Sequence, residues 1–290
     1  MKQSLAIKEA LDKSTEFLRK KGSSSPRLDA EVLLSHIVGL SRLQLYLQFD
    51  RPLTEKEKEQ YRGFLKRRAE HEPVAYITGE KEFHSLSFHV TPAVLIPRPD
   101  TEILVEEAIK KIREQTRELG DKPPRVFEVG TGSGAVAISV LKQFPDLIIT
   151  GSDISAPALA VANKNAERHG VSNRLSLVRG DLFAGEAGPF DLIVSNPPYI
   201  AETEKNSLPP DIIKYEPPSA LLGGRAGLDV ILRVIFEGEN FLSPGGWILV
   251  EIGKGQYINL KSKIEEQMKF QSVQAVEDYT GTVRVLCVKK

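Results

Sequence analysis

Residues 126–134 read Val-Phe-Glu-Val-Gly-Thr-Gly-Ser-Gly, an apolar run followed at once by three glycines at alternate positions. The run at 126–129 predicts a buried strand, and residues 135–142 predict a helix directly behind the glycines. Glycine allows the backbone to turn sharply and to approach a ligand closely. The stretch therefore indicates the first strand, loop and helix of an α/β domain that holds a ligand at the loop.

Strand and helix patterns continue to alternate after this stretch. Strands are predicted at residues 126–129, 147–150, 175–178, 190–194, 247–252, 273–276 and 283–288, and helices at 135–142, 156–168 and 228–241. Such βαβ repetition predicts a mostly parallel sheet with helices on both faces. Ligands of these sheets bind at the carboxyl ends of the strands, near the topological switch point. We expect this Rossmann-like domain to span residues 98–290.

The chain ahead of this domain has a different character. Residues 1–75 show only helical patterns, and Thr54 with Glu57 forms the capping-box signature of a helix start. Residues 76–97 predict a short β-hairpin that links two domains. Asp100 is predicted to cap the first helix after this linker. We therefore expect a small N-terminal helical bundle, a hairpin linker and the α/β domain.

Composition excludes several function classes. The 290 residues carry 39 Lys and Arg against 39 Asp and Glu, which argues against a protein that coats nucleic acid. The single cysteine, Cys287, fits a reducing compartment and is predicted to be an inert buried thiol. None of the five histidines has a second ligand at metal spacing, so we expect no metal site. No apolar stretch reaches the length of a membrane span. We expect a soluble, cytoplasmic monomer.

A second motif follows the strand predicted at residues 190–194. The next residues are Ser195 and then Asn196-Pro197-Pro198-Tyr199. The two prolines fix φ and stiffen the turn, which leaves the Asn196 side-chain oxygen and the first proline carbonyl as two acceptors. Those acceptors suit the two protons of a planar NH2 group, and Tyr199 can stack on its plane. A proline-rich turn that merely closes a strand is the alternative, and this motif alone leaves both open.

The glycine loop alone also leaves two cofactors open. Gly130, Gly132 and Ala135 satisfy the dinucleotide pattern G-x-G-x-x-G/A, and Asp153 lies about where a ribose-binding carboxylate belongs. A nicotinamide-dependent dehydrogenase is therefore one alternative, and a non-catalytic nucleotide-binding protein is another.

Three features favour S-adenosylmethionine (SAM). Gly134 gives a G-x-G-x-G loop preceded by Glu128, Asp181 ends the third strand where it could accept from an adenine amino group, and hydride transfer has no use for the Asn196 turn. Asp153 could by itself be a helix N-cap and Asp181 a turn residue. Because these groups follow successive strands, together they predict a SAM site.

With these residues in place, the chain closely resembles the release-factor glutamine N5-methyltransferases, the PrmC/HemK family. The resemblance covers nearly the whole chain and is carried by these segments: Pro26–Glu31, Leu95–Glu102, Glu128–Gly134, Ser195–Ile200, Glu216-Pro217, Gly227–Asp229 and Asp278–Gly281. The Asn-Pro-Pro-Tyr turn is shared with adenine-N6 and some guanine-N2 methyltransferases. The helical domain joined to the Ile-Pro-Arg-Pro segment is more specific.

The resemblance implies a SAM-dependent methyltransferase whose last strand is antiparallel. Its substrate is the glutamine side chain of the Gly-Gly-Gln motif in class-1 peptide-chain release factors, and the helical domain recognises that protein. No stable nucleic-acid binding is expected, although a nucleic-acid exocyclic-amine methyltransferase is the alternative function.

The resemblance also implies roles for individual residues. The glycine loop and Asp153 hold the methionine and ribose parts of SAM, and the Asn196 turn holds the substrate amide. Candidate cofactor-binding residues are Glu128, Gly130, Thr131, Gly132, Ser133, Gly134, Asp153, Asp181, Leu182 and Asn196. Candidate substrate-binding residues are Asn196, Pro197, Pro198 and Tyr199, of which Asn196, Pro197 and Tyr199 are the catalytic candidates.

Four positions stay unassigned at this level. Some family members have Trp where this chain has Leu182, so whether Leu182 contacts adenine is open. The sequence also assigns no role to Arg98, Glu216 or Glu251.

Overall fold

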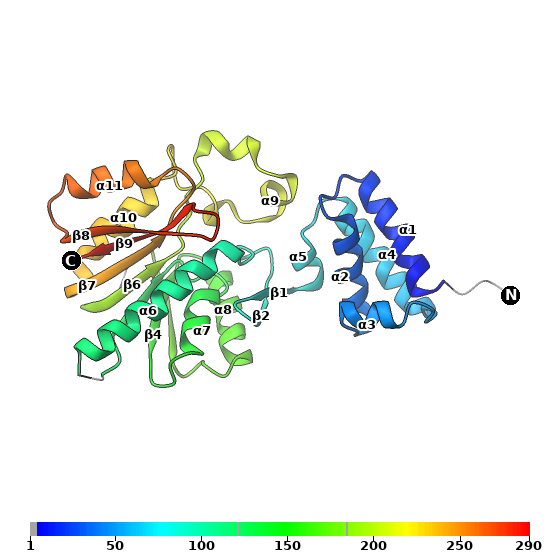
Figure 1. Cartoon of the computed structure of the whole chain (residues 1–290), viewed down its shortest axis with the longest axis horizontal. Coiled ribbons are helices and arrows are strands. Elements are labelled where there is room, and N and C mark those ends of the chain that lie inside the picture. Colours follow the sequence, from blue (N-terminus) through cyan, green and yellow to red (C-terminus); the bar gives the residue numbers. More distant parts are fainter. Residues whose placement is uncertain (1–4, 121, 184) are drawn as a thin grey trace. The chain divides into compact units, whose positions relative to one another are not determined.

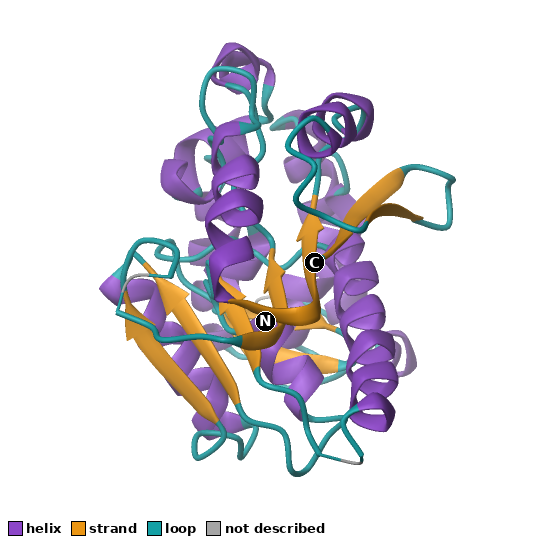
Figure 2. Cartoon of the chain, turned by 90° about the vertical axis from the view of Figure 1, so that its left-hand side faces the viewer, coloured by secondary structure: helices purple, strands orange, loops and turns teal. Residues whose placement is uncertain are grey.

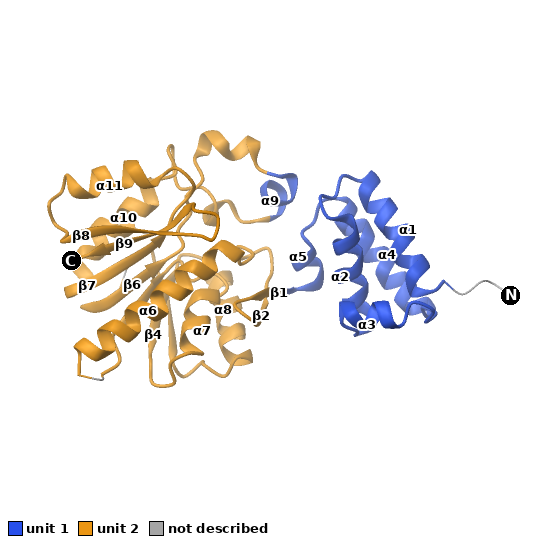
Figure 3. Ribbon diagram, in the orientation of Figure 1, with its two compact units in different colours: residues 1–80, 209–215 blue, residues 81–208, 216–290 orange. Residues whose placement is uncertain are grey.

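The computed structural model describes residues 5–120, 122–183 and 185–290. The chain forms two compact units (Figure 3). One unit comprises the residues up to Glu80 together with Pro209–Tyr215, and the other comprises Lys81–Leu208 and Glu216–Lys290. No helix of the described residues is both long enough and apolar enough to cross a membrane.

The first unit consists of helices and their connecting loops apart from Glu80, which begins a strand, and the helical region that the sequence predicts is present (Figure 1). Its helices are α1 (Ile7–Lys20), α2 (Pro26–Val38), α3 (Arg42–Leu47), α4 (Glu55–Ala69), α5 (Val74–Thr78) and α9 (Pro210–Tyr215). They enclose one apolar core that includes Leu11, Leu33 and Tyr61. The predicted capping box is confirmed, because Thr54 Oγ1 accepts from the Glu57 amide at 3.2 Å and the Glu57 carboxylate accepts from the Thr54 amide at 2.7 Å.

Helix α9 is an insertion from the second half of the chain, and sequence patterns did not predict it. Lys214 Nζ and Tyr215 Oη donate to the Glu70 carbonyl, which follows α4, at 3.3 and 3.0 Å. These bonds satisfy a carbonyl that the end of a helix leaves unpaired. The helical unit is therefore completed by residues far away in sequence.

The second unit is built on a seven-stranded sheet with the order β5-β4-β3-β6-β7-β9-β8. Its strands are β3 (Val126–Val129), β4 (Ile149–Asp153), β5 (Leu175–Arg179), β6 (Phe190–Ser195), β7 (Leu242–Glu251), β8 (Ser272–Glu277) and β9 (Val283–Lys289). The first five strands of the order pair in parallel, and β9 pairs antiparallel to both β7 and β8. The predicted mostly parallel sheet with an antiparallel last strand is confirmed.

Helices cover both faces of this sheet (Figure 2). They are α6 (Glu102–Glu118), α7 (Ala135–Leu141), α8 (Ala156–Arg168), α10 (Asp229–Gly238) and α11 (Tyr257–Glu265). Val126 and Phe127 of β3 belong to two different core clusters, the first with α6 and α7 and the second with α10 and α11. Successive side chains of a strand point to opposite faces, so a strand buried on both sides must be apolar throughout.

The predicted linker segment contains a two-stranded hairpin, β1 (Glu80–Phe83) and β2 (Leu86–His89). Its two turn residues, His84 and Ser85, have φ of 47° and 60°. Positive φ at both positions is the geometry of a tight hairpin turn whose twist matches that of the strands.

Two local expectations differ from the structure. Asp100 does not cap α6, because it lies in a 3₁₀ turn (Pro99–Thr101) and its carboxylate pairs with Arg284 at 2.8 Å. The ion pair with a distant residue outweighs a local capping bond. Helix α11, which buries only Leu260 and Ile264, was not predicted from its weak periodicity.

Candidate active site

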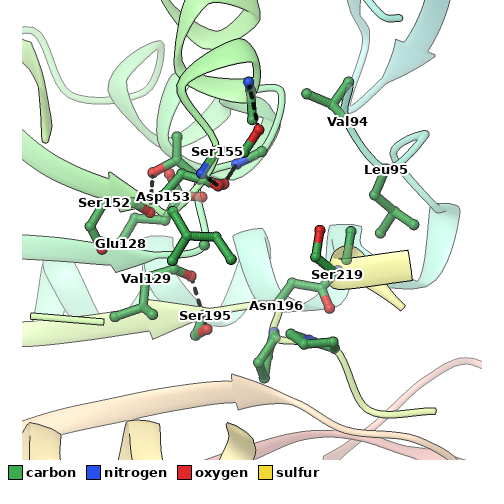
Figure 4. Close-up of a pocket in the computed structure, with 18 of the residues that line it drawn as sticks. Val94, Leu95, Glu128, Val129, Ser152, Asp153, Ser155, Ser195, Asn196 and Ser219 are labelled. Carbon is green, nitrogen blue, oxygen red and sulfur yellow. Dashed lines mark hydrogen bonds between the residues drawn. The ribbon is translucent and has the colours of Figure 1, made fainter. Parts of the chain in front are cut away.

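A cavity of about 330 Å³ lies at the carboxyl ends of β3, β4, β5 and β6. Figure 4 shows side chains from several of these strand ends around it, with Val94 and Leu95 contributed by the segment after β2. The cavity is lined by eleven of the predicted site residues: Glu128, Gly130, Thr131, Gly132, Ser133, Asp153, Asp181, Leu182, Asn196, Pro197 and Pro198. Gly134 and Tyr199 do not line it, although each directly follows in sequence a residue that does.

The glycine loop needs glycine at each of its three positions. Gly130, Gly132 and Gly134 have φ of 74°, 57° and 78°, a region that other L-residues rarely adopt. A Cβ on Gly134 would in addition lie 2.9 Å from Ile138 Cδ1. The loop is fixed to the end of β4, because the Gly130 amide donates to the Ser152 carbonyl at 2.8 Å.

Asp153 is held at the end of β4 with its carboxylate at the cavity (Figure 4). Its Oδ2 accepts from the Gly132 amide at 2.8 Å, and its Oδ1 accepts from the Ser155 amide at 2.9 Å. Ser155, rather than Asp153, occupies the N-cap position of α8. A carboxylate has about four acceptor sites, so Asp153 retains capacity for the hydroxyl groups of a ligand.

Glu128 is a buried acid at the base of the cavity. Burial raises its pKa to about 8, and the nearby Asp153 carboxylate adds to the rise, while hydrogen bonds from Thr131 and the Ala137 backbone oppose it. Its Oε2 has no hydrogen-bond partner among the described residues. An unpartnered buried carboxyl is costly, so this site suits a ligand that brings a hydrogen-bond donor or a positive charge.

The residues after β5 form another wall of the cavity. Arg233 pairs with Asp181 through two hydrogen bonds, of 3.0 and 3.4 Å, and both side chains are half exposed. Leu182 is buried at a φ of 51°, which is unusual for a branched side chain. The Ser152 hydroxyl donates to the Leu182 carbonyl at 2.6 Å and helps to hold this conformation.

The Asn196 turn carries the two acceptors that the sequence predicts, and their role in binding an NH2 group stays a prediction. Asn196 Nδ2 donates to Thr101 Oγ1 at 3.0 Å, so the side-chain amide is anchored through its nitrogen. Among the described residues, no donor is bonded to Asn196 Oδ1 or to the Pro197 carbonyl. The Tyr199 hydroxyl donates to Glu251 Oε1 at 3.3 Å, and burial raises the pKa of this phenol.

Two glycines to which the sequence assigned no site role pack closely against the backbone of the Asn196 turn. A Cβ on Gly223 would lie 2.3 Å from the Pro198 carbonyl oxygen, and one on Gly227 would lie 2.2 Å from the Tyr199 carbonyl oxygen. Gln256 Nε2 donates to the same Tyr199 carbonyl at 2.8 Å. No side chain larger than hydrogen fits at these glycines, so the backbone of the turn is fixed by contact.

Sequence reasoning also missed the residues that attach the linker to the site. Asn165 of α8 is fully buried and bonds to both backbone groups of His89, at 2.7 and 2.9 Å, and to the Ser133 carbonyl at 2.9 Å. Glu216, one of the unassigned residues, is buried and paired with Arg98. A helical Asn and an isolated Glu carry no local signal, so neither role was predictable from spacing.

Comparison with known proteins decides the family. A model of the PrmC N-terminal domain matches residues 9–79, and a model of the Methyltransferase small domain matches residues 112–215. The release factor glutamine methyltransferase of Rhodopirellula baltica is 39% identical over 98% of this chain and 96% of its own length. The chain belongs to the release factor glutamine methyltransferase family. A second relative of that name, from Geobacter sulfurreducens, is 43% identical over 86% of this chain and 85% of its own length.

Solved structures agree with a methyltransferase fold. The hMettl16 catalytic domain in complex with the MAT2A 3′UTR hairpin 1 has a TM-score of 0.58, with 14% identity over 95% of this chain and 90% of that one. A methyltransferase from Pyrococcus furiosus has a TM-score of 0.52, with 20% identity over 70% of this chain and 88% of that one. Membership of a methyltransferase family decides against the dehydrogenase alternative that the glycine loop left open.

The raised pKa of Glu128 predicts a pH-dependent stability. A carboxyl group whose pKa is higher in the folded than in the unfolded protein adds to the free energy of unfolding. This contribution is complete below the unfolded pKa of about 4.5 and is lost as the pH rises towards about 8. Glu128→Gln cannot titrate. We therefore expect the melting temperature of this variant, relative to the parent, to increase by several degrees between pH 5 and pH 8. Each pKa unit corresponds to about 1.4 kcal/mol.

Thermal unfolding of the cofactor-free protein across this pH range measures the effect. The exposed Glu118→Gln serves as the control and should follow the parent at every pH. A constant difference between Glu128→Gln and the parent would contradict the prediction.

Proposed function

We propose that this protein transfers a methyl group from SAM to the side-chain amide nitrogen of a glutamine, within the Gly-Gly-Gln motif of class-1 release factors. The observation that carries the proposal is the Asn196 turn at the edge of the cavity, with Asn196 Oδ1 and the Pro197 carbonyl unbonded among the described residues. Two acceptors on a rigid turn match the two protons of a primary amide. The resemblance and the relatives' printed names support a release factor as the substrate. We propose that the protein acts as a cytoplasmic monomer.

The cavity fits SAM on chemical grounds. The glycine loop offers backbone at close range, and Asp153 offers acceptors for ribose hydroxyls. Glu128, with an unpartnered Oε2, offers a partner for an ammonium group. Asp181 and Leu182 provide an acceptor and an apolar wall for adenine, although Arg233 already occupies part of the Asp181 carboxylate.

The Asn196 turn would contribute to catalysis mainly by orienting the substrate amide. An amide nitrogen is a poor nucleophile, and bound SAM supplies the electrophilic methyl group. Asn196 Oδ1 and the Pro197 carbonyl would accept hydrogen bonds from the two N–H groups of the amide. They would hold its nitrogen roughly 3–3.5 Å from the methyl carbon that it attacks. The same acceptors would stabilise the positive charge that develops on nitrogen as the N–C bond forms and the S–C bond to the methyl group breaks, and the nitrogen would then lose one of its two protons to water. Stacking of Tyr199 on the amide stays a prediction.

Methyl transfer to purified release factor tests the reaction directly. With isotopically labelled SAM, we expect mass spectrometry to find one added methyl group on the glutamine of the Gly-Gly-Gln peptide. A protein that binds SAM but leaves this glutamine unmodified would contradict the proposed substrate. Nucleic-acid exocyclic amines would then be tested with the same labelled cofactor, because the Asn-Pro-Pro-Tyr turn suits those amines as well.

Replacement of Asn196 separates catalysis from cofactor binding. We expect Asn196→Ala to lower turnover on the order of 10²–10³-fold, because one of the two acceptors is lost. The dissociation constant for SAM, measured by calorimetry, should remain close to that of the parent. Asn163→Ala, on the exposed face of α8, is the matched control and should leave both values unchanged. Normal turnover of Asn196→Ala would contradict the proposed role of Asn196 in binding the substrate amide.

We also propose that the helical unit recognises the release factor. The short helix α3 exposes two leucines one turn apart, Leu43 at 70% and Leu47 at 76%, beside the half-exposed Tyr46. Large apolar side chains that remain exposed on a small helical unit are suited to contact with another protein. We take the release factor as that protein because the resemblance assigns its recognition to this domain.

A double variant tests this role of the helical unit. We expect Leu43→Asp with Leu47→Asp to raise the KM for whole release factor roughly tenfold, while transfer to a short Gly-Gly-Gln peptide is unchanged. Ile148→Asp, which replaces an exposed aliphatic side chain of the other unit, is the control. An unchanged KM for the double variant would exclude this surface from recognition.

A further inference from the structure

Two segments of the chain line the cavity next to Asn196. They are residues 95–97 at the end of the linker, which we call the linker wall, and residues 217–222, which we call the loop wall. The side chains that face the cavity are those of Leu95, Pro97, Pro217, Ser219, Ala220 and Leu222. In Figure 4, Leu95 and Ser219 lie on the Asn196 side of the cavity. None of the six side chains carries a charge, and an uncharged slot beside two acceptors suits a side-chain amide on an aliphatic stem.

The loop wall is attached to the Asn196 turn at its C-terminal end. The Ile200 amide donates to the Leu221 carbonyl at 2.9 Å, and the Gly223 amide donates to the Ile200 carbonyl at 2.9 Å. Gly223 also lies against the Pro198 carbonyl, from which a Cβ would be only 2.3 Å away. This end of the loop wall therefore cannot move independently of the turn.

The linker wall is attached to the same turn by another route. Arg98 directly follows the linker wall, and its carbonyl accepts from the Thr101 amide at 3.1 Å. The Thr101 hydroxyl oxygen in turn accepts from Asn196 Nδ2 at 3.0 Å. One short 3₁₀ turn thus connects the linker wall to the Asn196 side chain.

Glu216 joins the two ends that remain. It directly precedes the loop wall, at the point where the chain re-enters the second unit after α9, and its side chain is 1% exposed. Its Oε1 accepts from the Arg98 guanidinium, and its Oε2 accepts from the Ile96 amide at 3.4 Å. One carboxylate thus binds residues on both sides of Pro97, whose φ is fixed by its ring. The Asn196 turn, the two walls and this carboxylate therefore form a closed ring of contacts.

The ion pair is the contact of this ring that one substitution can open. A buried carboxylate is costly unless a positive charge and hydrogen bonds compensate for the lost water. Replacement of Arg98 would remove its positive charge from beside Glu216, and the carboxylate would then gain free energy by moving toward water. The loop wall follows Glu216 directly in sequence, and so it would be displaced as well.

We propose that Arg98 and Glu216 are positioning residues for methyl transfer. Their ion pair closes the ring, so that the stem of the target side chain enters between two fixed walls and its nitrogen reaches the two acceptors of the Asn196 turn. The inference rests on the proposed function. It assigns a role to two residues for which motif spacing suggested none.

Substitution of Arg98 is the first test. Arg98→Met keeps an unbranched stem but removes the charge, and we expect kcat/KM for the Gly-Gly-Gln peptide to fall about 10- to 100-fold. The dissociation constant for SAM should stay within about twofold of the parent value. Because Arg98 bonds to Glu216 through one nitrogen, Nη2, Arg98→Lys should restore kcat/KM to within about threefold. Lys261→Met, which breaks an exposed ion pair with Glu265 in α11, is the matched control and should be fully active.

A double-mutant cycle separates the pair from two independent structural residues. Glu216→Gln keeps the size of the side chain but removes its charge, and we expect a loss similar to that of Arg98→Met. The double variant should lose no more than either single variant, because each change opens the same ring. Parent-like kcat/KM in both single variants, losses that multiply in the double variant, or a loss that Arg98→Lys does not rescue would overturn the proposal. So would a SAM dissociation constant that rises as much as kcat/KM falls.

Amide hydrogen exchange of the cofactor-free protein makes the test independent of the substrate. The Ala220 and Leu222 amides donate within the loop wall, each at 2.9 Å, and their exchange should become about tenfold faster in Arg98→Met. Exchange in the glycine loop, residues 130–134, should not change, and Arg98→Lys should match the parent. Equal exchange of the loop wall in the parent and in Arg98→Met overturns the positioning role, even if the methylated substrate proves to be another amine. If the release factor is not methylated while the exchange pattern is as expected, the proposed substrate fails and the positioning role stands.

Discussion

Parallel pairing of β3 with β6 is the constraint on which the site depends. Val129 pairs with Ser195 at the ends of the two strands, and the Ser195 hydroxyl donates to the Val129 carbonyl at 2.9 Å. Parallel neighbours end at the same edge of a sheet, so the glycine loop and the Asn196 turn must leave it side by side. Because the order of strands reverses between β3 and β6, the two connections diverge and leave space between them. The glycine loop and the Asn196 turn thus line one cavity.

Close backbone contact then determines how rigid this turn can be. The Asn196 turn has no freedom to retreat, because Gly223 and Gly227 lie against the Pro198 and Tyr199 carbonyls. The prolines restrict φ from within, and Gln256 anchors the Tyr199 carbonyl from outside. Orientation of a weak nucleophile requires a rigid support, since a displacement of 1 Å can cost about 100-fold in rate. The rigidity therefore comes from contacts that are distributed over several later segments.

Local patterns predicted much of the fold because they report local physics. Apolar runs identified the strands, and the Thr54 capping box identified the start of a helix. Patterns failed where a distant partner decided the outcome. Asp100 bonds to Arg284 instead of capping α6, and α9 joins the helical unit through contacts with Glu70. Neither partner is visible within a window of neighbouring residues.

The same distinction explains what could be predicted of the site. Residues that face the cavity follow strands and carry recognisable spacing, and eleven of them line it. Other residues of the site, such as Thr101, Asn165 and Gly223, have roles defined only by which backbone or side chain they touch. A threonine before a helix or a buried asparagine has many structural explanations. Only the three-dimensional contacts assign these residues to the site.

Two buried acids show how stability and function conflict here. Glu128 is the penultimate residue of β3 and Glu251 is the last residue of β7, and burial raises the pKa of both, to about 8 and about 7. Apolar residues at these positions would avoid that cost. Each has an Oε2 atom without a hydrogen-bond partner among the described residues, but Glu128 lines the cavity, whereas Glu251 Oε1 accepts from the Tyr199 hydroxyl. Glu128 is therefore accessible to a group that enters the cavity, whereas Glu251 is bonded within the protein. One sheet edge thus carries two buried acids, one at the cavity and one bonded to the Tyr199 end of the Asn196 turn.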